Sequence, residues 1–105
     1  MTAISSHRPF RDSYDIAVNQ LNAHISWEDV FDSIIYFGAP EPELEQSSKT
    51  EFVASEPFPR IAQLMAAASM CKGWVALINA DIVVSVRLGA VVQECIRKGI
   101  KAITS

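Results

Sequence analysis

The stretch Gly73-Trp74-Val75-Ala76-Leu77-Ile78-Asn79-Ala80-Asp81-Ile82-Val83-Val84 joins an apolar run to two polar residues and a β-branched continuation. Residues 75–78 are apolar without alternation, which is typical of a strand that is covered on both faces in a parallel sheet. Periodicity alone also allows a buried helix for so short a run. The β-branched residues 82–84 favour a strand. The stretch therefore predicts a central parallel strand that ends in polar side chains.

Asn79 and Asp81 are the residues on which a functional prediction can rest. An unpaired carboxylate is costly in an apolar interior, so Asp81 is expected where water, a cation or a donor reaches it. The carboxyl end of a parallel strand is such a place, and ligands of open α/β sheets bind there. In an extended backbone the two side chains share one face and offer oxygen ligands to Mg²⁺ or Mn²⁺. Taken without its context, Asn-Ala-Asp is better explained as a turn.

The rest of the chain alternates strands with helices. The predicted order is strand, helix, strand, strand, helix, strand, helix, strand, with the other strands at Thr2–Ser6, Phe31–Gly38, Glu51–Ser55 and Ile100–Thr104. The third of these strands is expected at a sheet edge. This order is typical of an α/β protein with a largely parallel sheet and helices on both faces. We therefore predict one Rossmann-like, three-layer domain over residues 1–105.

Apolar residues at helical spacing predict the buried face of each helix. Trp27 is expected to anchor the first helix, whereas Asn19, Gln20 and Asn22 should face solvent or a neighbouring loop, and His24 should lie at the boundary. Pro59 suits the first turn of the second helix, Gly73 its end, and Ser85 the cap of the third. The predicted buried stripes are Tyr14, Ala17, Val18, Leu21 and Ile25; Ile61, Leu64, Met65 and Ala68; and Leu88, Val91, Val92, Cys95 and Ile96.

Composition excludes several classes of protein. The net charge is −3 and the pI about 5.2, which gives no support for a nucleic-acid partner. No run approaches the ~18 apolar residues that a membrane span needs. Cys71 and Cys95 lie within or beside apolar helical patterns, so we expect reduced thiols and a cytoplasmic protein. Two histidines and no CxxC or HExxH motif make a zinc site a poor interpretation.

Several segments together resemble the amino-terminal half of a GT-A type glycosyltransferase, similar to family 2. They are the opening Thr2-Ala3-Ile4-Ser5-Ser6-His7-Arg8-Pro9-Phe10, then Asn19-Gln20-Leu21-Asn22-Ala23 with Ser26-Trp27, then Ile34-Ile35-Tyr36-Phe37-Gly38, Pro59-Arg60, and Trp74 to Asp81. The resemblance covers nearly the whole chain. It implies a Rossmann-like sheet that holds a nucleotide-diphosphate sugar, with a divalent metal on the diphosphate.

The resemblance also implies site residues. Asp81 matches the last acid of the family's Asp-x-Asp motif and would be the metal ligand. Asn79 departs from the usual Asp and would bind the ribose, a metal-bound water or the metal itself. Ile4, Ser5 and Ser6 would lie against the nucleoside. Arg8 or Arg60 would approach the diphosphate, although a surface role is the simpler interpretation for each.

Only the nucleotide-binding half of such an enzyme is matched, and Gly38-Ala39-Pro40 stands where the family usually has an acid. The catalytic residues stay unassigned, and we expect the chain not to complete glycosyl transfer alone. The alternative is a non-catalytic α/β module that acts through self-association or a partner chain, because an incomplete sheet leaves edges open. Nucleotide binding distinguishes the two.

Overall fold

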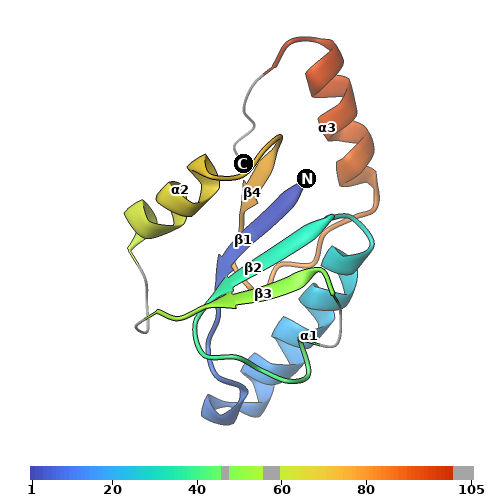
Figure 1. Cartoon of the computed structure of the whole chain (residues 1–105). Helices are drawn as coiled ribbons and strands as arrows, with labels where there is room; N and C mark the ends of the chain where they lie inside the picture. The colour runs from blue at the N-terminus through green and yellow to red at the C-terminus, as the bar shows by residue number, and fades with distance from the viewer. Residues whose placement is uncertain (46–47, 56–59, 101–105) are drawn as a thin grey trace.

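The computed structural model of the chain describes residues 1–45, 48–55 and 60–100. Its elements form the α/β arrangement of Figure 1, with strands and helices alternating along most of the chain. In order they are β1 (Thr2–Ser6), the short 3-10 helix η1 (Phe10–Asp12), α1 (Tyr14–Glu28), β2 (Ser33–Phe37), β3 (Thr50–Val53), α2 (Ile61–Ser69), β4 (Val75–Leu77) and α3 (Arg87–Arg97).

The four strands form one parallel sheet in the order β3-β2-β1-β4. The chain moves outward from β1 to β2 and β3, and then returns through α2 to place β4 on the free side of β1. The direction of winding therefore reverses between β1 and β4. In open α/β sheets this reversal creates a crevice at the carboxyl ends of the two strands. The predicted α/β fold class with a parallel sheet is confirmed.

The face of the sheet that packs against α1 contains the main core. Ala3 is paired with Ile34, so both side chains project to this face, and both are fully buried. Trp27 of α1 is also fully buried and stacks on Tyr36, with ring centroids 5.8 Å apart. Aromatic pairs of this kind add about 0.5–1.5 kcal/mol beyond area burial. The prediction that Trp27 anchors the first helix is confirmed.

The opposite face is covered less completely. Ile4 projects there and is fully buried, and α2 packs against β1. Right-handed crossovers place α1 and α2 on opposite sides of the sheet (Figure 1). No described side chain of α2 is buried, however, and Ile61 is 72% exposed and Met65 55% exposed. The stripe predicted for this helix is therefore only partly in contact with the sheet.

The stretch 73–84 differs from its prediction as a central strand. Regular pairing is restricted to Val75–Leu77, and this short strand lies at the edge of the sheet, where Leu77 is 36% exposed. The two central strands are β1 and β2. Residues 82–84 leave the sheet because α1 satisfies their backbone: Trp27 Nε1 donates to the Ile82 carbonyl at 2.7 Å. The amide of Val84 donates to Ser26 Oγ at 3.0 Å.

The predicted stripe of α1 was wrong at both ends. Tyr14 is 82% exposed and Ile25 63% exposed, whereas Gln20 and His24 are each 4% exposed. The periodicity argument assumes that the inward side chains are apolar. Here the inward face of α1 carries two polar side chains, Gln20 and His24, that have hydrogen-bond partners inside the protein. The Tyr36 hydroxyl and His24 Nδ1, for example, share a hydrogen bond of 2.7 Å. His24 is thus a core residue rather than a boundary residue.

The edge position predicted for the third strand is confirmed, since β3 pairs on one side with β2. Of the five-residue stripe predicted for the third helix, Val92 is buried, but Val91 and Ile96 are each 49% exposed. The interpretation of that stripe as fully buried was wrong. The predicted final strand and Pro59 fall outside the described residues except for Ile100, which is not in a strand. Within the described ranges no helix has the length and apolar character to cross a membrane.

Candidate functional site

A cavity of about 250 Å³ lies where the winding of the sheet reverses, beyond the carboxyl ends of β1 and β4. Three segments that are far apart in the sequence line it. They are the residues that follow β1, the first turns of α1 and the residues that follow β4: Ser6, Arg8, Ile16, Asn19, Gln20, Asn79, Ala80 and Asp81. The cavity is therefore in the crevice that the topology predicts.

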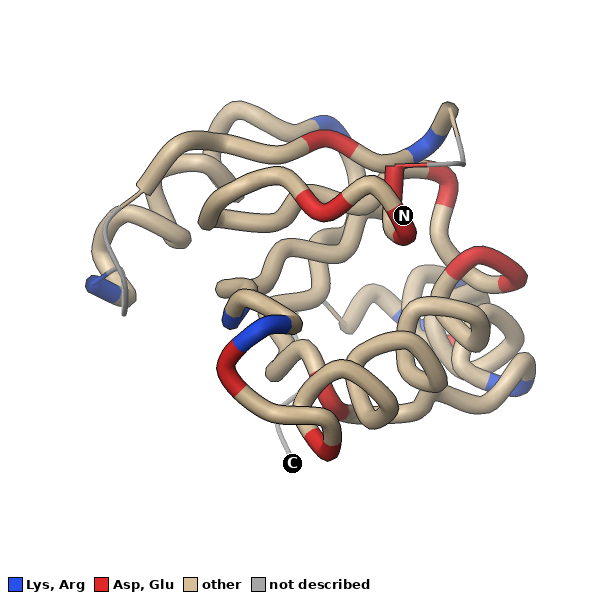
Figure 2. Tube along the Cα trace, turned by 90° about the horizontal axis from the view of Figure 1, so that it is seen from below, with Lys and Arg blue, Asp and Glu red and all other residues tan. Residues whose placement is uncertain are grey.

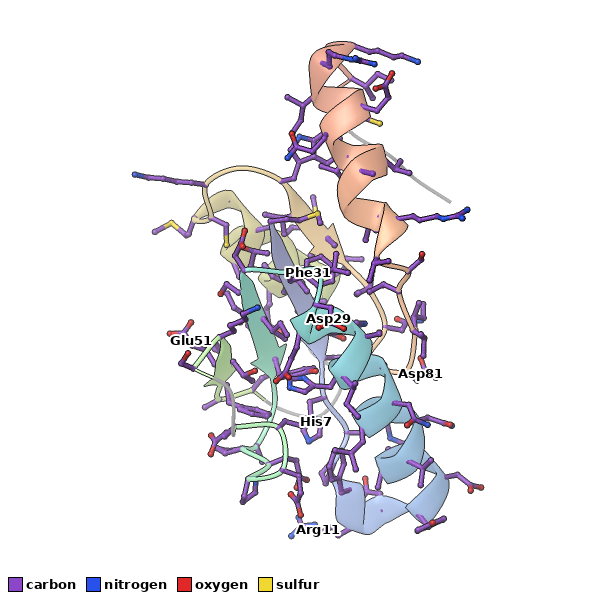
Figure 3. The ribbon with its side chains drawn as sticks, turned by 90° about the vertical axis from the view of Figure 1, so that its right-hand side faces the viewer. His7, Arg11, Asp29, Phe31, Glu51 and Asp81 are labelled. Carbon is purple, nitrogen blue, oxygen red and sulfur yellow. The ribbon has the colours of Figure 1, made fainter. Side chains whose placement is uncertain are left out.

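The segment after β4 is held as a turn. The amide of Ile82 donates to the Asn79 carbonyl at 3.1 Å, which closes the turn, and the amide of Ile78 donates to the Ile4 carbonyl at 3.2 Å. The second bond extends the contact with β1 just beyond the strand. Asn79 and Asp81 are both exposed and line the cavity. The interpretation of Asn-Ala-Asp as a turn is confirmed, and this turn faces the crevice. Figure 3 shows Asp81 on the loop beside α1.

The first turns of α1 add side chains that the sequence prediction left out of the site. Ile16, Asn19 and Gln20 line the cavity. The helix of a βαβ unit begins at the carboxyl edge of the sheet, so its first residues lie close to a ligand in the crevice. This positional rule could have identified the first residues of the helix as part of the site from the sequence alone. The expectation that Asn19 and Gln20 face solvent or a neighbouring loop is confirmed: Asn19 is exposed, and Gln20 Nε2 donates to the Arg8 carbonyl at 2.9 Å.

Behind the cavity, the loop after β1 is fastened by a buried histidine. The amide of His7 donates to the Phe37 carbonyl at 2.9 Å, and the His7 ring bonds to Gln20 Oε1 through Nδ1, also at 2.9 Å. A side chain at Gly38 would meet the His7 carbonyl, because a Cβ there would lie 2.9 Å from that oxygen. Glycine at this position therefore permits the close approach of the two loops.

The cavity has one acidic and one basic side chain. Asp81 and Arg8 both line it, together with the hydroxyl of Ser6 and three side-chain amides. Figure 2 shows the described Lys and Arg residues scattered over the chain rather than gathered in one patch. This lining suits a ligand that combines negative charge with several hydrogen-bonding groups.

The donor set also bears on a divalent metal. No group of three or more His, Cys, Asp or Glu side chains that could hold a metal ion occurs among the described residues. Mg²⁺ is commonly bound through one or two carboxylates together with substrate phosphates and waters. Asp81, with Asn79 on the same turn and in the lining of the same cavity, fits this arrangement, in which a nucleotide would supply the remaining ligands.

A second polar cluster lies in the core, on α1 and β2. His24 bonds to the Tyr36 hydroxyl and, through Nε2, to Glu28 Oε1 at 3.0 Å. Burial lowers the pKa of His24, although the nearby Glu28 carboxylate acts in the opposite direction. Burial also raises the pKa of Tyr36 well above its usual range. Tyr36 is 1% exposed and His24 4% exposed, so these two members of the cluster are buried in the core, whereas the Glu28 side chain is 38% exposed.

The structure brings together some of the predicted site residues and separates others. Ser6, Asn79 and Asp81 line one cavity, and so does Arg8. Ile4 and Ser5 are buried in β1 and do not contribute to the lining. Arg60 precedes α2, where its amide donates to Gln63 Oε1 at 2.9 Å, and it is absent from the cavity. The roles of all these residues toward a ligand stay predictions.

The fold defines the class of the protein as α/β with a parallel, doubly wound sheet. Comparison of the chain with known protein families, with curated proteins and with solved structures found no match.

Proposed function

We propose that this chain binds a nucleotide diphosphate, as the sugar-nucleotide-binding unit of a glycosyltransferase-like protein. What supports the proposal is the position of the cavity at the reversal of the sheet, between the carboxyl ends of β1 and β4. The side chains there are of the required types. Arg8 provides a cation for phosphate, and Ser6, Asn19 and Asn79 provide hydrogen bonds for a ribose or sugar.

Asp81 is proposed as the residue that would hold a Mg²⁺ or Mn²⁺ ion on the diphosphate, and Asn79 would contact the ion, a metal-bound water or the ribose. Such an ion, when bound, neutralises the charge of the diphosphate and of the departing nucleotide. The residues of the chain hold and orient the donor. Arg8 contacts the phosphates from the β1 side of the crevice, while Asp81 approaches from the β4 side. No catalytic residue is proposed, and glycosyl transfer itself is assigned to residues outside this cavity.

The proposal is tested by calorimetric titration of the 105-residue protein with UDP and with other nucleoside diphosphates, with and without Mn²⁺. We expect binding to require the metal. Asp81→Ala should weaken metal-dependent nucleotide binding by at least ~10-fold. Asp81 would touch the metal directly, so its loss should reduce the affinity more than the loss of a residue that only supports a metal ligand.

Asp29→Ala is the matched control, because Asp29 is an exposed carboxylate on the other end of α1, away from the cavity (Figure 3). Its binding should equal that of the native protein. Binding that is independent of metal, or equal losses in both variants, would show that Asp81 has no special role. Absence of binding to every nucleotide would contradict the proposed function as a whole.

A second candidate function is self-association. Residues 61–69 of α2 contain no charged side chain, and Met70, just beyond them, is 85% exposed. Within residues 1–45, 48–55 and 60–100, no strand pairs with the outer side of β4. The exposed apolar helix and this side of β4 favour pairing of two copies, since both surfaces would be covered without bringing like charges together. Sedimentation velocity at increasing protein concentration tests this candidate, and a monomer at every concentration contradicts it.

A further inference from the structure

We infer that His7 is a positioning residue for the proposed phosphate contact, and that it acts through Gln20 on the loop that carries Arg8. The inference rests on the proposed function and assigns to it a residue that does not touch the ligand. The His7 side chain is fully buried and is absent from the cavity lining. Any effect of His7 on a bound nucleotide must therefore pass through its neighbours.

The first step is the orientation of the Gln20 amide. Its Nε2 donates to the Arg8 carbonyl at 2.9 Å, which requires the nitrogen to point to the loop. Its Oε1 then faces His7 Nδ1 at 2.9 Å. Because an amide oxygen can only accept, Nδ1 must carry the hydrogen. One hydrogen-bonded chain thus runs from the ring of His7 through Gln20 to the backbone of Arg8.

The second step is the way in which the ring of His7 is held. Three aromatic rings, those of Phe10, Tyr36 and Phe52, surround it at centroid distances of 5.4, 5.8 and 5.6 Å. They come from η1, β2 and β3 and leave little freedom for the imidazole to turn. Figure 3 shows His7 on the inner side of α1, toward the strands. The donor at Nδ1 is therefore fixed in the direction of Gln20.

The other ring nitrogen faces the loop that follows β2. His7 Nε2 lies 3.4 Å from Glu41 Oε1, and that oxygen accepts the amide hydrogen of Phe10 at 2.9 Å. His7 Nε2 makes no hydrogen bond among the residues that the structure describes. The hydrogen bond of the His7 ring is therefore the one to Gln20, and a substitution that tests the inference must remove this bond.

The chain leads to the cavity because Ser6 and Arg8, on either side of His7, both line it. An exposed arginine loses rotamer and backbone entropy when it binds a phosphate. Gln20 and His7 lower this cost by holding the backbone of Arg8 before the ligand arrives. Loss of the contact should therefore weaken the binding of the phosphates and leave the binding of the nucleoside unchanged.

Three substitutions separate positioning from stability. Asparagine places its amide nitrogen near the position of imidazole Nδ1, so His7→Asn keeps the donor to Gln20. Glutamine places its nitrogen near Nε2, so His7→Gln places a donor toward Glu41 and loses the one to Gln20. His7→Phe retains the aromatic packing without any donor. Since His7→Phe fills the ring's space, we expect its melting temperature to exceed that of His7→Asn.

The experiment measures the affinities of UDP and uridine for the native protein and the three variants, together with ¹⁵N order parameters of Arg8 in the free proteins. We expect His7→Asn to bind UDP within ~2-fold of native, and His7→Gln and His7→Phe to bind it ~5- to 10-fold more weakly, with uridine unchanged. In the Arg8→Ala background, His7→Phe should cause no further loss. The Arg8 order parameter should drop from about 0.85 toward 0.6 in His7→Gln and His7→Phe alone.

UDP affinities that follow the melting temperatures, equal losses for UDP and uridine, or effects that add to that of Arg8→Ala would overturn the inference. If the native protein binds no nucleotide, the proposed function fails, and the order parameters still decide whether His7 holds the loop. An Arg8 amide that is equally ordered in all four proteins would show that it does not.

Discussion

The two halves of this chain are packed very differently. In the segment from β1 to the end of β2, large side chains such as Trp27, Phe31 and Tyr36 are at most 1% exposed. Among the described residues from 48 onward, Val92 is the single buried one. The sheet is continuous across both halves, so the difference lies in the layers that cover it. α1 fills its face of the sheet, whereas α2 and α3 leave large parts of their apolar surface in contact with solvent.

Each half of the chain contributes residues to the proposed site. Ser6, Arg8 and Gln20 belong to the well-packed half, whereas Asn79 and Asp81 belong to the loosely packed one. Regions with few buried contacts open at low free energy, and ligand-binding segments are commonly found there. The well-packed half would then hold the backbone of Arg8 in position, and the turn after β4 would complete the site from the loosely packed half.

The two tryptophans test the contrast most strongly. Trp27→Ala should lower the free energy of unfolding by about 3–5 kcal/mol, because it removes a fully buried side chain and its bond to the Ile82 carbonyl. Trp74 is half-buried just before β4, and Trp74→Ala should have a clearly smaller effect. Urea unfolding followed by circular dichroism measures both. Equal losses would mean that the two halves contribute equally to stability.

The polar cluster of the well-packed half provides a second test. Tyr36→Phe removes the hydroxyl that bonds to His24 Nδ1, leaving that nitrogen buried and unpaired. We expect a loss of about 1–3 kcal/mol in denaturant titrations. Tyr14→Phe removes a hydroxyl from a side chain that is 82% exposed and should change stability very little. Indistinguishable midpoints for the two variants would show that the buried bond contributes nothing net.

The same cluster predicts a pH dependence. Burial lowers the folded-state pKa of His24 below its usual value of 6.5, so the unfolded chain binds more protons as the pH falls below 6.5. The contribution of neutral His24 to the free energy of unfolding is therefore fully present above pH 6.5, and it is progressively lost as the pH falls toward the pKa of His24 in the folded protein. Melting temperatures between pH 8 and 5, compared with those of His24→Gln, isolate this contribution. Parallel curves for the two proteins would contradict the direction of the shift.

The smallest effect is expected on α2. Ile61→Ala removes atoms from a side chain that is 72% exposed, so the free energy of unfolding should change by less than about 0.5 kcal/mol. Measurement at low and high protein concentration sharpens the comparison. A loss above ~1 kcal/mol that appears only at high concentration would indicate that a second copy covers this helix, in agreement with the second candidate function.

Much of the fold could be predicted from local patterns. The strands around Ile34-Ile35 and Thr2–Ser6 were recognised because β-branched and apolar runs bounded by Gly, Pro and polar loops have few other structures available. The alternation with helices then indicated a parallel sheet. Part of the site could also be predicted. A polar turn that follows an apolar parallel strand lies at the carboxyl ends of the strands, and Asn79 and Asp81 line the cavity there together with Ser6.

The misassigned residues share one physical cause. Periodicity assumes apolar inward side chains, so it put the exposed Tyr14 and Ile25 into the buried stripe of α1 and left the buried Gln20 and His24 out of it. Burial of Gln20 is possible because His7 and the Arg8 carbonyl satisfy its amide. These partners come from another segment of the chain, and no local pattern contains them.

Local patterns therefore predicted the strands and helices of the described residues, their order and the carboxyl end of the sheet as the place of Asp81, because these depend on short-range preferences and on the handedness of crossovers. Tertiary structure alone decided that β1 rather than β4 is central, that Trp27 draws residues 82–84 onto α1, and that Gln20 lies between His7 and Arg8. Each of these depends on satisfying a polar group or covering an apolar surface with residues distant in sequence, and such partners are chosen only when the chain folds.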